Sequence, residues 1–533
     1  MACSLLVACG DDDEDGSDAN RDSGVDSGTR PDSGGPNLDA GLDSTVANPG
    51  DGSVSPDSSA TFAPKVIAAS ISAGDDAFYG VAHDATGNVY ATGKTNVSGS
   101  DYAVVVAKYS AAGALDTTFG TNGYAIKNVI EAYPEASQTN SHEQGRAVVV
   151  QASGKIVVAA QASHASVPAD AGVIVNDTDV YLVRFNANGT PDTGFGINGA
   201  VQVDLGTAVV QNVTSDAGVT PTLRAPDRVW SLSQTTDGKL VIHGETRDGA
   251  LIADGGLRFD SDFVLARFSA DGVLDTSFSG DGVVLTDVQL SNASARSATV
   301  LANGSIVGVG YSSNTVLATM SKQNPILYKV AADGTPDPSF AATLNSDPVE
   351  QPGVWHNFAR NDQANCEAYG AAPQGDKFVT LGYGPTPNTT GTGTDWVWFR
   401  FNADGTQDKT WGNNGETFQD PGGFGDNGRA LITLPDNRVL GVGGGRAKVE
   451  PKPETPNTLP TEALIGVVNA NGAPDTTFGP GGLQLLDLGG GRSDMLWSVD
   501  VSADKKSVAA VGEGYNAAQT DDRDGVVVIF PVP

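Results

Sequence analysis

The sequence contains little cysteine and little positive charge. Cys3 and Cys9 stand at the start of the 533-residue chain, so Cys366 is alone in the body and cannot form a disulfide there. Packing and strand pairing must therefore hold the fold. Lys and Arg total 31 against 64 Asp and Glu, which gives a formal net charge of −33 at pH 7. This balance excludes the basic surface that nucleic-acid binding needs, and we expect no nucleic-acid partner.

Motifs of common enzyme chemistry are also absent from the sequence. The histidines show neither H-x-x-x-H nor H-E-x-x-H spacing, and there is no cysteine zinc pattern, no G-x-x-x-x-G-K-[ST] loop and no G-x-S-x-G elbow. We therefore assign no catalytic residue, no metal site and no cofactor. The sequence leans against an enzyme without deciding the question. No segment reaches the roughly 18 apolar residues of a membrane-spanning helix.

The first residues carry a targeting pattern. A short apolar run at residues 5–8 precedes Cys9 and Gly10, and it resembles the lipobox of bacterial lipoproteins. The resemblance implies that residues 1–9 are a lipoprotein signal and that lipid on the Cys9 sulfur anchors the protein to the outer membrane or cell surface. Residues 1–8 contain no Lys or Arg, whereas a secretory signal has a positive start, so we expect the natural start upstream of Met1. Without the lipid, we expect a periplasmic or extracellular protein.

The next segment, residues 10–61, is made of Asp, Ser, Gly and Pro with almost no large apolar side chains. Such a segment buries too little surface to offset the entropy of ordering. We expect a disordered, self-repelling linker. The acidic run at residues 11–15 is either a weak calcium site or only a solvated charge run.

From residue 62 onward the chain repeats one pattern seven times. Each unit has a short apolar strand, a tight turn, a second apolar strand, a variable loop and a third apolar strand, and most units add a fourth strand. Gly, Asn and Asp tolerate the positive φ that tight hairpins need. The turn positions are Gly87, Gly154, Gly238, Gly304, Asp376, Asn437 and Lys505. Four strands per repeat predict an all-β fold, with residues 62–533 forming a single closed β-propeller of about seven four-stranded blades.

The two ends of the repeat region predict how the propeller closes. The last unit stops at Phe530 and lacks a fourth strand, while an unassigned strand lies before the first unit, at about residues 65–71. We expect this strand to complete the last blade, because closure removes free sheet edges.

Six units carry a motif in which an Asp precedes an aromatic residue by three positions. Because one Asp recurs around the whole ring, we interpret it as a turn cap, with the aromatic residue packed between blades, and not as a catalytic or calcium site. The pairs are Asp116 and Phe119, Asp192 and Phe195, Asp275 and Phe278, Asp337 and Phe340, Asp408 and Trp411, and Asp475 and Phe478.

This A-D-G-x-x-D-x-x-F-G element, together with the x-G-K-[IL]-V strand, resembles the delta-60 repeat of exported deltaproteobacterial proteins, including those of myxobacteria. The resemblance covers nearly all of residues 62–533. Ser279 and Ala341 replace the glycine of the motif in two copies, and the seventh unit lacks the element. The family implies a propeller and a surface location, and it implies no established reaction.

A second recurrent position lies eight residues before each turn position. If the first strand of each blade is innermost, these residues line the central channel, where they either grip a sugar or peptide or only pack blade against blade. They are Tyr79, Arg146, Trp230, Arg296, Ala368, Arg429 and Trp497. Three residues earlier stand Asp76, Glu143, Asp227, Ala293, Asn365, Asp426 and Asp494.

The connections between strands 2 and 3 and between successive blades vary widely in length, as at residues 161–179, 206–226, 345–365 and 446–462. Variable loops on a rigid scaffold commonly carry function. The loop with Trp355, His356 and Phe358 offers the best contact candidates.

We therefore expect an exported, lipid-anchored binding or scaffold protein that is a monomer. Its variable-loop face would contact a glycan, a peptide or a partner protein on the cell surface, and the lipid would be its only link to a membrane. The alternative is an extracellular hydrolase or lyase with its site at the mouth of the channel. Clustered carboxylates and histidine at that mouth would favour the enzyme.

Overall fold

The computed structural model describes residues 62–99, 101–129, 142–164, 174–205, 209–215, 218–247, 260–288, 291–313, 323–341, 353–356, 366–385, 394–421, 425–445, 461–488, 493–515 and 522–533. Cys9, the linker and Phe358 lie outside the described residues, so what the sequence predicts for them stays a prediction. Within the described part of the chain, no helix has the length and apolar character needed to cross a membrane.

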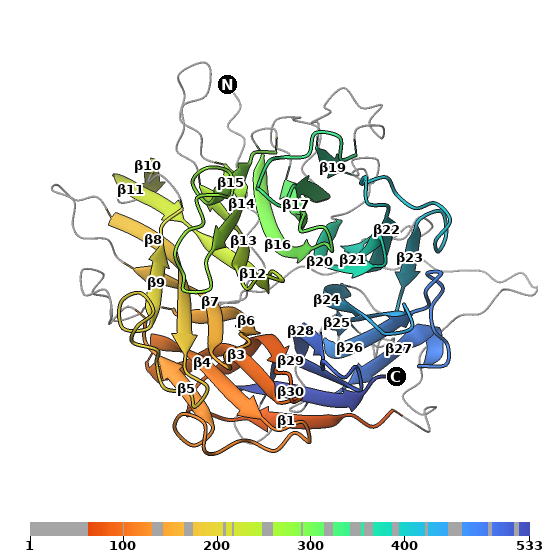
Figure 1. Cartoon of the computed structure of the whole chain (residues 1–533), viewed down its shortest axis with the longest axis horizontal. Coiled ribbons are helices and arrows are strands. Elements are labelled where there is room, and N and C mark those ends of the chain that lie inside the picture. The colour runs from red at the N-terminus through yellow and green to blue at the C-terminus, as the bar shows by residue number, and fades with distance from the viewer. Residues whose placement is uncertain are drawn as a thin grey trace, which may run out of the picture. The chain divides into compact units, whose positions relative to one another are not determined.

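The described strands form seven sheets around a central axis, as Figure 1 shows. This arrangement confirms the all-β, seven-bladed propeller. From the axis outward, blades 1 to 4 contain β2 (Asp76–His83), β3 (Val89–Ser98), β4 (Asp101–Tyr109) and β5 (Tyr124–Lys127); β6 (Gln144–Val150), β7 (Ile156–His164), β8 (Ile174–Phe185) and β9 (Ala200–Val203); β12 (Arg228–Gln234), β13 (Leu240–Arg247), β14 (Ser261–Phe268) and β15 (Val283–Thr286); and β16 (Asn292–Val300), β17 (Ile306–Ser313), β18 (Gln323–Val330) and β19 (Val354–His356).

Blades 5 to 7 follow the same order, with a short 3₁₀ turn at Pro480–Gly482 before the fourth strand of blade 6. Their strands are β20 (Glu367–Gln374), β21 (Lys377–Gly384), β22 (Asp395–Phe401) and β23 (Glu416–Gln419); β24 (Asn427–Thr433), β25 (Val439–Gly445), β26 (Glu462–Val468) and β27 (Leu483–Leu486); and β28 (Met495–Val501), β29 (Ser507–Tyr515), β30 (Arg523–Pro531) and β1 (Lys65–Ala69).

The hydrophobic core lies between the blades. Val104 and Phe119 of blade 1 pack in one cluster with Val158 and Tyr181 of blade 2, and each of these side chains is at most 1% exposed. Because neighbouring blades cover both faces of a sheet, second and third strands such as β13, β14 and β25 are buried along nearly their whole length and show no alternation of buried and exposed residues.

Blade 7 closes the ring by joining the two ends of the described chain. β1 pairs antiparallel with β30, and Lys65 stands opposite Ile529. Phe62 extends the closure by packing edge-on against Phe478 at 5.0 Å and Phe530 at 5.2 Å between ring centroids. The predicted completion of the last blade by the N-terminal strand is thus confirmed.

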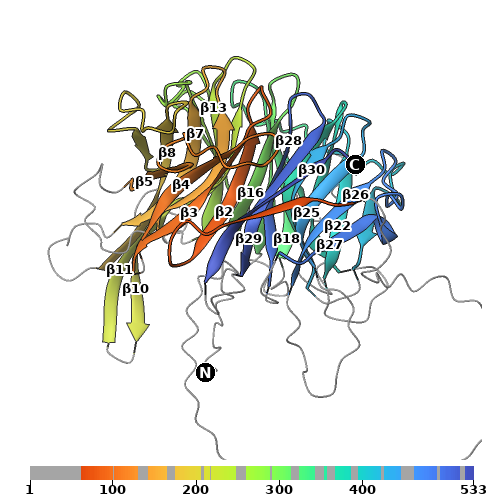
Figure 2. The same ribbon diagram turned by 90° about the horizontal axis from the view of Figure 1, so that it is seen from below.

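Two of the expected variable loops contain strands instead. Part of the segment after blade 2 forms a hairpin of β10 (Val209–Ser215) and β11 (Gly218–Pro226), and β11 runs parallel to the start of β8. Figure 2 shows this hairpin projecting from one face of the propeller. Hairpin formation between adjacent segments satisfies backbone hydrogen bonds that a long loop would leave open.

The expected loop with Trp355 and His356 is the second correction. These residues belong to β19 and pair with Leu327 and Ile326, so they form the outermost strand of blade 4. An insertion delays this strand along the chain: β19 begins well after Phe340, whereas β5 begins soon after Phe119. The strand spacing of the other blades therefore led us to expect a loop where β19 lies.

The aspartate of the repeat motif organises the turn that follows the third strand. Asp275 Oδ1 accepts hydrogen bonds from the Ser277 N–H at 3.1 Å and the Ser277 hydroxyl at 2.6 Å, while Oδ2 pairs with Arg267 at 2.8 Å and Lys239 at 2.9 Å. The hydrogen bonds from Ser277 and Lys239 hold the pKa of Asp275 well below its usual range. The bond to a Ser or Thr two residues later recurs at Asp116, Asp337, Asp408 and Asp475.

Asp192 differs, because Gly194 stands two residues later and has no hydroxyl. Its carboxylate pairs instead with Lys155 at 2.8 Å and Arg184 at 2.7 Å. All six motif aspartates therefore hold turns through hydrogen bonds and ion pairs.

In four of the six copies, the residue after the motif aromatic fastens one blade to the next. The Gly120 N–H donates to the Asn188 carbonyl of blade 2 at 2.8 Å, beside the buried Phe119 ring. Equivalent bonds join Ser279 to Asp333, Ala341 to Asp404, and Gly412 to Asn471. The other motif aromatics, Phe195, Phe278, Phe340, Trp411 and Phe478, are also buried.

Gly189 tests this joint. Its φ is +84°, and a Cβ there would lie 2.5 Å from the Gly120 nitrogen, so Gly189→Ala should separate the blades locally and lower the free energy of unfolding by about 2 kcal/mol or more. Gly238 has a φ of +86° with nothing within 4 Å, so Gly238→Ala should cost only the backbone strain, about 1 kcal/mol. Chemical denaturation of both variants measures the difference, and equal losses would contradict the joint.

His243 lies in the core between blades 3 and 4. Its ring stacks on Phe263 and tilts against Tyr328, each at 5.8 Å between centroids. Burial lowers the pKa of His243 to about 3, so the folded protein keeps this imidazole neutral.

The stability of the protein should respond to this pKa in acid. The unfolded chain takes up a proton on His243 below its ordinary pKa of 6.5, whereas the folded chain does not do so until about 3. His243 should therefore make the free energy of unfolding fall as pH drops from 6.5 towards 3, by about 1.4 kcal/mol per pH unit. Denaturation of the wild type and His243→Leu across this range should show a shallower fall in the variant, and parallel curves would contradict the neutral buried imidazole.

Candidate ligand cavity

The first strand of every blade contains a β-bulge at the same place. Pairing with the second strand skips one residue in each blade, and this extra residue is re-aimed out of the regular pleat. The skipped residues are Tyr79, Arg146, Trp230, Arg296, Tyr369, Arg429 and Trp497. We call these seven residues the arginine–aromatic ring.

Blade 5 contributes Tyr369 to this ring and not Ala368, which the sequence pattern named. Gly80 pairs with Thr92 in blade 1, whereas the equivalent Gly370 pairs with Leu381, so the first hairpin of blade 5 is one residue shorter. Counting eight residues back from the turn therefore gives Ala368, one position before the true ring residue. Ala368 itself is 1% exposed and packs in the core.

Arginines and aromatic rings alternate around the axis. The Arg146 guanidinium lies 4.9 Å from the Tyr79 ring centroid and 4.7 Å from Trp230. Arg296 lies 4.2 Å from Trp230 and 4.6 Å from Tyr369. Both are cation–π distances.

The alternation ends at the joint between blades 7 and 1. Arg429 lies 4.3 Å from Tyr369 and 4.6 Å from Trp497. Seven positions cannot alternate completely, so Trp497 meets Tyr79 edge-on at 5.9 Å. Every residue of the ring thus contacts both of its neighbours in the ring.

The ring borders a cavity of about 230 Å³ on the propeller axis. Each first strand lines the cavity with its ring residue and the two or three residues that follow it, and with none that precedes it. The cavity therefore extends from the ring towards the first hairpin of each blade, on the face opposite the loops that connect successive blades. Besides the ring it is lined by Gly80, Val81, Ala147, Val148, Ser231, Leu232, Ser233, Ser297, Ala298, Gly370, Ala371, Ala430, Leu431, Ser498 and Val499.

The polar partners of Arg296 lie around the ring. Arg296 donates to the Ala295 carbonyl at 2.9 Å, to the Tyr311 hydroxyl at 3.0 Å and to the Tyr369 hydroxyl at 3.4 Å. Behind it, burial raises the pKa of Glu367, although Arg296 opposes that rise, and Glu367 accepts a hydrogen bond from the Tyr383 hydroxyl.

The carboxylates that precede the ring residues by three positions accept hydrogen bonds from backbone N–H groups. Asp76 accepts from the Ile71 N–H at 2.7 Å, Glu143 from Val129 at 2.8 Å, Asp227 from Leu205 at 2.6 Å and Asp494 from Leu488 at 2.7 Å. Each therefore ties the segment that ends one blade to the first strand of the next. None of them lines the cavity.

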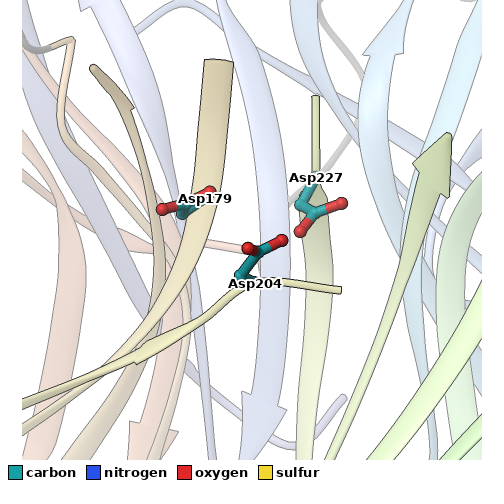
Figure 3. A group of neighbouring side chains, drawn as sticks. All are labelled: Asp179, Asp204 and Asp227. Atoms are coloured by element: carbon teal, nitrogen blue, oxygen red, sulfur yellow. The ribbon is translucent and has the colours of Figure 1, made fainter. Parts of the chain in front are cut away.

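Among the described residues, three clusters of aspartates lie near the ends of the third and fourth strands of blades 2, 3 and 5. The clusters are Asp179, Asp204 and Asp227; Asp260, Asp262 and Asp287; and Asp395, Asp420 and Asp426, with ligand atoms within 4.8 Å of one another in each. Figure 3 shows the first cluster, whose three carboxyl groups face one another. Gln202 already donates to Asp179, and Thr246 and Leu205 donate to Asp227.

Burial raises the pKa of Asp227 to about 8, and Asp179 and Asp204 add to the rise. The folded protein therefore keeps Asp227 protonated well above the ordinary pKa of 3.8, and stability should be lost as pH rises from 3.8 to 8. Asp227→Asn should flatten this loss and raise the free energy of unfolding at pH 8. Chemical denaturation between pH 5 and 9 measures it, and a variant less stable than the wild type at pH 8 would contradict the protonated carboxyl.

His83, His142 and His243 lie outside the cavity lining. His83 Nδ1 contacts Asp500 Oδ2 at 3.0 Å across the joint between blades 7 and 1, and His142 stacks on Tyr102 at 6.0 Å. His243 lies in the core, while His164 and His356 lie in β7 and β19. Cys366 is a buried thiol that forms no disulfide with any described residue.

Three stretches of the chain match one family model, described as "Domain of unknown function (DUF5122) beta-propeller": residues 151–195, 235–278 and 301–340. Each stretch ends on a motif aromatic, at Phe195, Phe278 and Phe340. The chain is a β-propeller repeat protein. The finer assignment to the delta-60 type and to a myxobacterial source stays a prediction, and no curated protein matches the sequence.

Solved structures similar to this propeller include several enzymes. The α-L-arabinofuranosidase Arb93A from Fusarium graminearum is 9% identical, with 72% of this chain and 92% of that chain covered and a TM-score of 0.36. A polysaccharide lyase of family PL25, an ulvan lyase, is 8% identical over 88% and 96%, with a TM-score of 0.43. Virginiamycin B lyase from Staphylococcus aureus is 8% identical over 87% and 99%, with a TM-score of 0.35. These likenesses concern the fold alone.

Proposed function

We propose that this propeller is an exported, lipid-anchored binding protein whose central cavity holds part of a glycan, peptide or protein partner. The observation that carries the proposal is the arginine–aromatic ring at the cavity. All seven inner strands deliver one large side chain to the same place, and cations and aromatic rings together suit a polar ligand.

The composition of the cavity lining favours binding over the alternative of a hydrolase or lyase. Among the described residues that line the cavity there is no Asp, Glu, His, Cys or Lys. Proton transfer in such enzymes relies mainly on side chains of these types, or on tyrosine, within hydrogen-bond reach of the substrate. The lining does contain Tyr79 and Tyr369, but burial raises the pKa of Tyr369, which makes it a poor base. The lining offers arginines, indoles, phenols and serine hydroxyls, which bind and orient a ligand.

The opposite face supplies a second surface for a larger partner. The connections between successive blades lie there, and the hairpin of β10 and β11 belongs to one of them. In this proposal the lipid on Cys9 tethers a monomeric propeller to the outer membrane or cell surface, and binding requires no cofactor.

A thermal-shift screen of the full chain tests the binding function. With glycans, peptidoglycan fragments and peptides as probes, a ligand at about 100 times its Kd should stabilise the fold by about 2.7 kcal/mol. Trp230→Ala should abolish the shift, because Trp230 stacks between Arg146 and Arg296 at the cavity.

Val273→Ala is the matched control, since Val273 is 66% exposed on the outer turns, and it should leave the shift unchanged. Calcium and a chelator form a separate arm and should shift neither protein. If a ligand still raises the melting temperature of Trp230→Ala, its site lies outside the cavity. If no probe raises the melting temperature of the wild type, small-ligand binding is rejected.

A further inference from the structure

The arginine–aromatic ring contains hydrogen-bond donors that lack acceptors. Within the part of the chain that the structure describes, the indole N–H groups of Trp230 and Trp497 and the Nε of Arg429 are buried without a hydrogen-bond partner. Buried donors left in this way are costly, and they are rare in native proteins. An acceptor supplied by a ligand would relieve that cost.

Arg429 and Arg296 differ in their surroundings, although they hold equivalent positions. Arg296 donates through its two terminal nitrogens to Ala295, Tyr311 and Tyr369, and only its Nε lacks a partner among the described residues. Arg429 contacts the rings of Tyr369 and Trp497 through their faces, and it makes no hydrogen bond with any described residue. Arg429 is therefore the arginine of this pair whose terminal nitrogens carry no hydrogen bond to a described residue, and these nitrogens, not the buried Nε, are available to a ligand.

The geometry around Arg429 is fixed before any ligand arrives. Its guanidinium is held between two aromatic rings, at 4.3 Å and 4.6 Å, and the unpartnered indole N–H of Trp497 belongs to the adjacent blade. A ligand that binds there does not have to order these side chains first, which lowers the entropic cost of binding.

Three features of the cavity indicate the chemistry of the ligand. The planar guanidinium fork matches a carboxylate with two parallel hydrogen bonds. Among the described residues that line the cavity there is no acidic side chain to repel an anion. Its volume of about 230 Å³ falls below the 300–1,000 Å³ of pockets for drug-sized ligands, so it fits a single sugar unit, and the hydroxyls of Ser297 and Ser498 lie in the same lining.

We propose that the cavity binds an acidic sugar, a hexuronate unit, and that Arg429 and Trp497 together hold its carboxylate. This inference rests on the proposed binding function and deepens it by naming the ligand class. The carboxylate accepts from the Arg429 fork and the Trp497 indole, while the sugar hydroxyls meet the serine hydroxyls of the lining.

Titration calorimetry of the full chain with sodium glucuronate and with glucose tests the proposal. The two probes differ only in a carboxylate against a hydroxymethyl group, and glucuronate should bind at least about tenfold more tightly. Arg429→Gln should weaken glucuronate binding by about tenfold or more. Trp497→Phe keeps the aromatic face but removes the N–H, and it should weaken glucuronate binding by a smaller factor.

Lys409→Gln is the charge-matched control, because Lys409 is exposed, and it should leave the Kd for glucuronate unchanged. Circular dichroism and the Kd for glucose establish that Arg429→Gln is still folded. Arg429→Lys keeps the charge without the fork and should recover only part of the affinity.

Several outcomes would overturn the proposal. Equal affinities for glucose and glucuronate, unchanged by Arg429→Gln, would leave the binding function intact and reject the carboxylate. If inorganic sulfate displaces glucuronate at equal concentration, the cavity is a general oxyanion site and is not selective for an acidic sugar. Binding of other panel ligands without glucuronate would reject only this ligand class, whereas no binding of any probe would reject the proposed function itself.

Discussion

The pairing of β1 with β30 is the contact on which the rest of the molecule depends. It joins residues from opposite ends of the described chain, Lys65 with Ile529 and Ala69 with Gly525. Without it, blade 7 would expose the edge of β30, and the packing of Phe62 on Phe478 and Phe530 would be lost. The cavity needs all seven inner strands at fixed angles, so its shape is a consequence of that closure.

A single local irregularity, repeated in every blade, turns this closed scaffold into a site. In a regular strand the ring residue would point towards a neighbouring blade and disappear into the core, as Ala368 does beside Tyr369. The bulge re-aims it. Because seven is odd, arginines and aromatics cannot alternate throughout, and the one aromatic–aromatic contact falls between Trp497 and Tyr79. It lies at the joint that β1 and β30 already secure.

The features that the sequence predicted correctly are those encoded within one repeat. Strand runs and tight turns follow from local patterns, and six of the seven ring positions follow from a constant distance to the turn. The fourth strand of blade 7 is the exception, since it was predicted by comparing the two ends of the repeat region. Tyr369 was missed because one hairpin is a residue shorter, and β19 because an insertion precedes it. The position of Arg146 between Tyr79 and Trp230 could not be predicted from the sequence, because it depends on how three blades pack against one another.

The acidic and basic side chains of the protein differ in the kind of partner that holds them. Carboxylates such as Asp76 and Asp494 accept from backbone N–H groups at the blade joints, and motif aspartates such as Asp275 pair with Lys and Arg at the turns. An acidic chain thereby uses much of its buried negative charge to hold blades together. Arg429 of the ring is held instead by the aromatic faces of Tyr369 and Trp497, which neutralise no charge and leave its hydrogen-bonding edge available. A cation buttressed in this way is suited to recognising an anion, because binding has to break no existing ion pair.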